Sequence, residues 1–173
     1  DAYRAMASSA ISEAANSLYV LGKIRQLTGL SVTVLSNSEQ RFLGYKALAA
    51  MEDNFNKVIE KGTAILDLDG GSFQISLFDK DALVTTQNIR MGSLRVRERL
   101  AGIQSETEHY EEMVEELIWN EVSSFKKMYL KDRKIENIML IGDVFTDSVY
   151  QNIEEKTTKI ISRENFNTWY EKI

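Results

Sequence analysis

Three extended segments that follow one another between residues 63 and 89 constrain the fold more than any other part of the sequence. The first two, Thr63–Leu68 and Ser72–Phe78, are joined by a short Asp-Gly-Gly turn, and the third runs from Ala82 to Ile89. Apolar side chains alternate along the first segment, which is the spacing of a strand with one buried face. A glycine-rich turn between two such segments is typical of a hairpin. The pattern therefore predicts an antiparallel meander of three strands.

Beyond the meander, the apolar spacing changes to that of alternating helices and strands. The expected elements are a short helix at 93–100, a long helix from a capping box at 105–108 to about 129, a strand at 135–141, a short helix from 146, a strand at 159–161 and a helix at 162–173. Three antiparallel strands followed by this alternation resemble a ribonuclease H-like layer, the half-unit of actin-like proteins. The expected fold class is α/β, built on that layer.

The first part of the chain predicts a helix at about 12–27, a strand at 31–35 and a helix from 36 to about 51. Gly29 is expected to end the first helix in the left-handed conformation. Ser36 is followed three residues later by Glu39, which is the spacing of a capping box. We expect a boundary between this part and the meander, which divides the chain into residues 1–58 and 59–173.

The composition excludes several kinds of chemistry. The chain has no cysteine and one histidine, His109, so disulfides, thiolate zinc sites, iron–sulfur clusters and thiol nucleophiles are excluded. Any metal would be a hard cation on carboxylate oxygens, which favours Mg²⁺. His109 is interpreted as a solvated residue in the first turn of a helix. The formal net charge of −5 argues against non-specific binding to nucleic acid or an anionic membrane.

The start of the chain carries no signal peptide and no long apolar run, so a cytoplasmic protein is expected. The first residue is Asp1 rather than methionine, and we interpret this as a processed or truncated start.

The sequence Asp67-Leu68-Asp69-Gly70-Gly71-Ser72 is the most informative candidate for a site. Two glycines at a turn let backbone N–H groups approach a ligand, and such a nest beside a serine hydroxyl suits phosphate oxygens. An aspartate at the end of a strand suits Mg²⁺. The same residues also make a plain hairpin turn, which the spacing alone favours.

Four collinear segments resemble the exopolyphosphatase and guanosine pentaphosphate phosphohydrolase family. Residues 67–74 resemble its Asp-Ile-Gly-Gly-Gly-Ser-Thr-Glu loop, and residues 91–96 its Leu-Gly-Ala-Val-Arg-Leu element. Residues 4–14 are similar to its Ala-Thr-Ser-Ala-Leu-Arg-Glu-Ala stretch, and residues 36–41 occupy the place of its Ser-Gly-x-Glu-Glu-Ala segment. In this comparison residues 1–58 are the tail of a first actin-like lobe, and residues 59–173 are most of a second.

The resemblance implies a Mg²⁺-dependent phosphoanhydride hydrolase acting on polyphosphate or guanosine pentaphosphate. It implies Glu39 as the catalytic acid or base and Asp67 as the metal ligand. The residues implied to bind phosphate are Gly70, Gly71, Ser72, Arg95 and Gly142. Expected partners are a phosphate-rich small molecule or polyphosphate and a second copy of the chain in a homodimer, with neither nucleic acid nor membrane.

The chain departs from the family pattern at several of these positions. Glutamines replace two expected glutamates at Gln40 and Gln74, serine replaces an expected arginine at Ser12, and Asp69 replaces the first loop glycine. The family's last glycine-rich loop is reduced to Gly142 followed by Asp-Val-Phe. Three hypotheses stay open: a hydrolase, a non-catalytic binding or regulatory module with the same fold, and a nucleotide-binding scaffold of the broader actin-like class. The departures favour the second.

Overall fold

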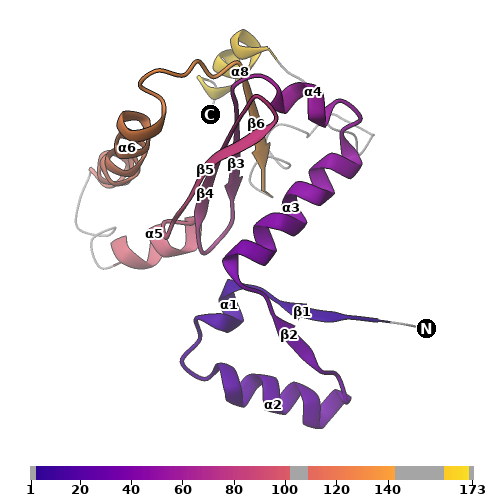
Figure 1. Cartoon of the computed structure of the whole chain (residues 1–173). Helices are drawn as coiled ribbons and strands as arrows, with labels where there is room; N and C mark the ends of the chain where they lie inside the picture. The colour runs from indigo at the N-terminus through magenta and orange to yellow at the C-terminus, as the bar shows by residue number, and fades with distance from the viewer. Residues whose placement is uncertain (1–2, 102–108, 143–161, 172–173) are drawn as a thin grey trace. The chain divides into compact units, whose positions relative to one another are not determined.

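The structure is a computed structural model that describes residues 3–101, 109–142 and 162–171. The chain divides into two compact units, Asp1–Ala50 and Met51–Ile173, which are coloured from indigo to yellow in Figure 1. The sequence placed this division after residue 58. The assignment of the two parts to actin-like lobes stays a prediction.

The first unit is a short parallel strand pair with helices. Its elements are β1 Ala5–Ala7, α1 Ser9–Ser12, α2 Ser17–Thr28, β2 Val32–Val34 and α3 Asn37–Met51, whose last residue belongs to the second unit. β1 pairs with β2 in parallel. As predicted, α2 ends at Gly29 in the left-handed conformation, with φ of 75° and its N–H donating to Arg25 O at 2.9 Å.

The helix predicted at 12–27 is instead a short helix, a turn and then α2, and β1 was not predicted. Neither α2 nor α3 buries a side chain. Leu18 and Leu27 on α2 are 86% and 78% exposed. Val20, Leu21 and Ile24 on the same helix are half-buried, so the apolar spacing marks a face that is only partly covered by the described residues.

The second unit is built on a mixed sheet. Its elements are α4 Phe55–Ile59, β3 Thr63–Leu68, β4 Phe73–Asp79, β5 Ala82–Ile89, α5 Ser93–Leu100, α6 Tyr110–Tyr129, β6 Asn137–Ile141 and α8 Arg163–Tyr170. The strand order is β5-β4-β3-β6, in which β3, β4 and β5 are antiparallel neighbours and β6 is parallel to β3. The predicted meander and α/β fold class are confirmed. The helix expected from 146, the strand expected at 159–161 and the capping box at 105–108 lie outside the described residues.

α5 and α6 lie on one side of this sheet (Figure 1), and apolar residues of the strands pack against both helices in one buried cluster. The buried cluster contains Ile75, Leu77, Ile89, Met91, Val96, Leu100 and Phe125. Phe125 on α6 is 2% exposed and Leu77 on β4 is fully buried. No helix among the described residues is long and apolar enough to cross a membrane.

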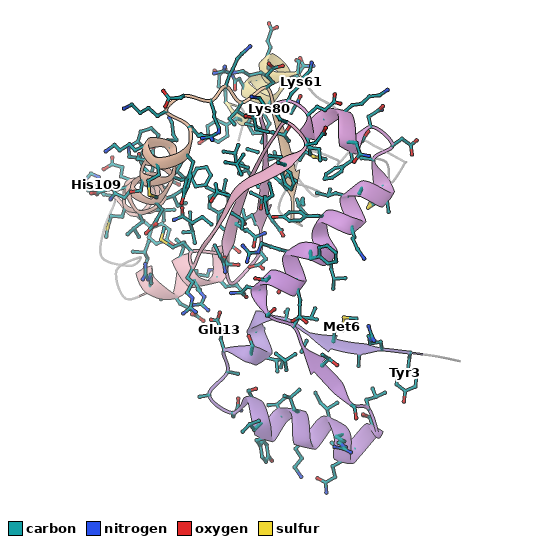
Figure 2. All side chains as sticks on the ribbon, viewed as in Figure 1. Tyr3, Met6, Glu13, Lys61, Lys80 and His109 are labelled. Atoms are coloured by element: carbon teal, nitrogen blue, oxygen red, sulfur yellow. The ribbon has the colours of Figure 1, made fainter. Side chains whose placement is uncertain are left out.

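The segment before β3 and the turn between β4 and β5 lie at the same end of the sheet. Figure 2 shows Lys61 and Lys80 side by side at the end where β3 begins, and Lys80 N–H donates to Glu60 O at 3.1 Å. The 69–72 turn closes β3 at its other end. Figure 2 labels His109 at the start of α6. Its Nδ1 lies 3.0 Å from Glu112 Oε2, and its side chain is 69% exposed, as predicted.

Candidate functional site

The turn between β3 and β4 is closed by hydrogen bonds of Asp69. The Asp69 N–H donates to Ser72 O at 3.0 Å. The Asp69 carboxylate oxygen Oδ1 accepts hydrogen bonds from the N–H groups of Gly71 at 2.7 Å and Ser72 at 2.6 Å. The two amides that converge in the turn therefore share an anion that belongs to the turn itself.

The start of α5 packs directly against this turn. The N–H of Ser93 donates to Asp69 O at 3.2 Å, and the N–H of Leu94 donates to Gly70 O at 3.0 Å. A helix begins with N–H groups that have no partner inside the helix, and here the carbonyls of the turn accept from three of them, because the N–H of Arg95 also donates to Gly70 O at 3.4 Å. Gly92 makes this approach possible, because a Cβ there would overlap with Asp69 O and Ser72 N.

Gly142 brings the end of β6 to the same place. Its φ of 136° is one that residues with a side chain rarely adopt, and a Cβ at this position would overlap with Leu68 O. The predicted phosphate-binding residues Gly70, Gly71, Ser72 and Gly142 thus lie at one end of the sheet, and α5, which starts against the turn, carries the half-buried Arg95. Their binding role stays a prediction.

A polar row crosses the same end of the sheet. Asp67 on β3 pairs in register with Gln74 on β4, which pairs in register with Asn88 on β5, so the three residues share one face. Asn88 Oδ1 is buried and has no hydrogen-bond partner among the described residues. The sequence analysis did not identify Asn88.

Burial raises the pKa of the Asp67 carboxyl, and the nearby charge of Asp69 raises this pKa further. The described residues contain no group of three or more histidine, cysteine, aspartate or glutamate side chains that could hold a metal ion. The opposite residue in the row, Gln74, supplies a neutral amide in place of a second carboxylate. Within the described residues, this row therefore offers a hard cation one carboxylate, that of Asp67.

Glu39 lies in the first unit and forms the predicted capping box at the start of α3. Its Oε2 accepts hydrogen bonds from Ser36 N–H and Ser36 Oγ–H, each at 2.8 Å, and the Glu39 N–H donates to Ser36 Oγ at 3.2 Å. The backbone and then the side-chain hydrogen bond from Ser36 lower the pKa of Glu39. The carboxylate is exposed, and its contacts are those of a helix cap.

The model of the Ppx/GppA phosphatase family matches residues 2–173. No curated protein sequence matches the chain.

The solved structures that resemble this chain show the same fold. A Ppx/GppA family member from Aquifex aeolicus is 18% identical, with a TM-score of 0.67 over 98% of this chain and 54% of its own. An exopolyphosphatase from Cytophaga hutchinsonii is 18% identical, with a TM-score of 0.70 over 98% of this chain and 55% of its own. This chain thus spans about half the length of these proteins.

Proposed function

The chain belongs to the Ppx/GppA phosphatase family, and on this premise we propose that it is a member that does not hydrolyse phosphoanhydrides and serves as a binding or regulatory module. A cytoplasmic location belongs to the same proposal. It rests on the absence of cysteine, because a cysteine-free chain needs no oxidising compartment.

The observation that carries the proposal is the engagement of Glu39. A general base must direct a lone pair at the attacking water and hold a pKa near the working pH. The Glu39 Oε2 instead accepts two hydrogen bonds from Ser36, which lower the pKa of the carboxyl and weaken it as a base. The next residue, where the family motif has its second glutamate, is Gln40, which cannot accept a proton from water at neutral pH.

The second unit supports the same proposal through the residues of its implied metal site. Hydrolysis of phosphoanhydrides in this family, as the resemblance implies, depends on Mg²⁺. Asp67 is the implied ligand here, and burial, followed by the charge of Asp69, raises the pKa of its carboxyl. The facing Gln74 adds no charge. The hydrolase alternative would need Glu39 to activate water and Asp67 to hold Mg²⁺, with polyphosphate or guanosine pentaphosphate as substrate.

The test is release of inorganic phosphate from polyphosphate and from guanosine pentaphosphate in the presence of Mg²⁺. The unmodified chain should release no more phosphate than the protein-free blank. A gain of release in the double variant Gln40→Glu, Gln74→Glu would show that the missing carboxylates are what prevents turnover. Gln26→Glu on α2, which adds a carboxylate to an exposed position, is the matched control and should stay inactive. Steady release by the unmodified chain that is abolished by Glu39→Gln would contradict the proposal.

A further inference from the structure

The amides that a phosphate group would use in the 69–72 turn are already occupied. Two backbone N–H groups that converge on one point form a nest that binds anionic oxygens. In this turn the point of convergence holds Asp69 Oδ1, at 2.7 Å from Gly71 N and 2.6 Å from Ser72 N. We propose that Asp69 is a built-in anion that fills the nest and excludes phosphate groups from this turn.

The position of the Asp69 side chain makes this exclusion direct. A phosphate oxygen bound to Gly71 and Ser72 would have to occupy the place of Asp69 Oδ1, because each N–H points at one acceptor. The Ser72 hydroxyl, which would complete a phosphate site, also lies toward Oδ1, with Ser72 Oγ at 3.5 Å. A ligand therefore has to displace the carboxylate before it gains any of these donors.

The charge of Asp69 opposes phosphate even when the carboxylate swings aside. Two unit charges about 4 Å apart repel enough to weaken binding about fivefold to several hundredfold, from aqueous to protein-like effective dielectrics. The carboxyl of Asp67 lies close enough for the charge of Asp69 to raise its pKa, second to burial, so this end of the sheet already carries two acidic side chains. A phosphate group would add a third anion there.

The turn does not depend on the carboxylate alone, which makes the proposal testable by substitution. Its backbone is also held by the Asp69 N–H to Ser72 O bond. On its outer side, the turn's carbonyls accept from Ser93 and Leu94 at the start of α5. Removing the side chain should therefore free the Gly71 and Ser72 amides while the turn keeps its place between β3, β4 and α5.

The inference rests on the proposed function in that it concerns a phosphate loop of the Ppx/GppA type that no longer binds its ligand. It concerns binding by the second unit alone and makes no use of Glu39. Binding and turnover can therefore be tested separately on the same protein.

The experiment is calorimetric titration of the full chain with pyrophosphate in metal-free buffer. Asp69→Gly removes both charge and occupancy, and should bind pyrophosphate at least tenfold more tightly than the unmodified chain. Asp69→Asn keeps a neutral acceptor oxygen over the amides and should show a smaller gain. Asp132→Asn, which removes one negative charge from an exposed position after α6, should bind as the unmodified chain does.

Equal affinity of the unmodified chain and Asp69→Gly would overturn the inference. So would the absence of any gain in both Asp69→Gly and Asp69→Asn, with circular dichroism showing that the variants are folded. Pyrophosphate binding by the unmodified chain that is as tight as binding by Asp69→Gly, without phosphate release, would overturn this inference and leave the proposed function in place. Release of phosphate by the unmodified chain would instead contradict the proposed function.

Discussion

Gly92→Ala is expected to be one of the most damaging single substitutions in the second unit. Gly92 precedes α5 with φ of −69° and ψ of 165°, which any residue can adopt, so backbone conformation does not require glycine. Space does. An added Cβ would overlap with Asp69 O and Ser72 N and lie 2.6 Å from Gly70 C. All three are backbone atoms of the 69–72 turn, and they cannot move by a simple side-chain rotation.

The expected cost follows from the nature of those contacts. Adding one carbon to a well-packed site typically costs about 1–3 kcal/mol, and rigid backbone neighbours place this position at the upper end, near 3 kcal/mol. Gly70→Ala is the matched comparison in the same turn. Its Cβ would lie 2.8 Å from Cδ1 of Leu94, a side chain that is 60% exposed and can rotate, so a cost below about 1 kcal/mol is expected.

The assay is urea unfolding followed by tryptophan fluorescence. Both tryptophans, Trp119 and Trp169, belong to the unit from Met51 onward, so the signal reports on that unit. With a urea dependence of about 1–3 kcal/mol per molar for a unit of this size, Gly92→Ala should lower the midpoint by about 1–3 M, and Gly70→Ala by much less. Equal shifts for the two variants would refute the argument that the turn and α5 are packed backbone against backbone.

Three further predictions concern the cap, the core and the buried carboxylate. Ser36→Ala should destabilise α3 by about 1 kcal/mol and should raise the pKa of Glu39, which carbon NMR can measure. Because folding lowers this pKa, the stabilisation of the fold by the Glu39 carboxylate is present at neutral pH and is lost as the pH falls through the lowered pKa. Phe125→Ala should cost about 3–5 kcal/mol in urea unfolding, because Phe125 is 2% exposed, whereas Met128→Ala on the same helix, at 58% exposed, should cost less than about 1 kcal/mol. Asp67→Asn should stabilise the second unit at neutral pH, because a raised pKa means that the folded state loses stability as the carboxyl ionises. This gain should vanish below the ordinary pKa of an aspartate. An unfolding midpoint that responds to Asp67→Asn equally at every pH would contradict this prediction.

Features set by a few neighbouring residues were predictable from the sequence. The left-handed Gly29 and the capping box of Ser36 and Glu39 are local devices whose geometry depends on residues at most four positions apart. The meander was predictable because its turns and alternation are also local. β1, by contrast, consists of Ala-Met-Ala, which has little intrinsic preference for a strand, and it is formed through pairing with the distant β2.

The sequence analysis did not identify Asn88 because β4 and β5 pair with an irregular register that the sequence does not indicate. If β4 and β5 were regular strands joined by a two-residue turn at Lys80 and Asp81, Gln87 would lie opposite Gln74. The register shifts between Leu77 and Phe78, and this shift puts Asn88 there instead. A single extra residue in one strand moves every later side chain to the other face, so the polar row with Asp67 could not be derived from spacing.

The role of Asp69 was only half predictable. Its charge follows from the sequence, and so does its conflict with a phosphate group. That its carboxylate turns inward and accepts from Gly71 and Ser72 depends on the closed form of the turn, which is fixed by contacts with Gly92 and the start of α5. The turn that looked like either a phosphate nest or a plain hairpin is a nest that holds its own anion.

The central claim is that this nest is filled, and amide hydrogen exchange at Gly71 and Ser72 tests it most directly. In the unmodified chain without any ligand, both amides should exchange slowly, and pyrophosphate should leave their rates unchanged. In Asp69→Gly they should exchange faster, and pyrophosphate should restore their protection. Fast exchange of both amides in the unmodified chain, slowed by pyrophosphate, would contradict the account.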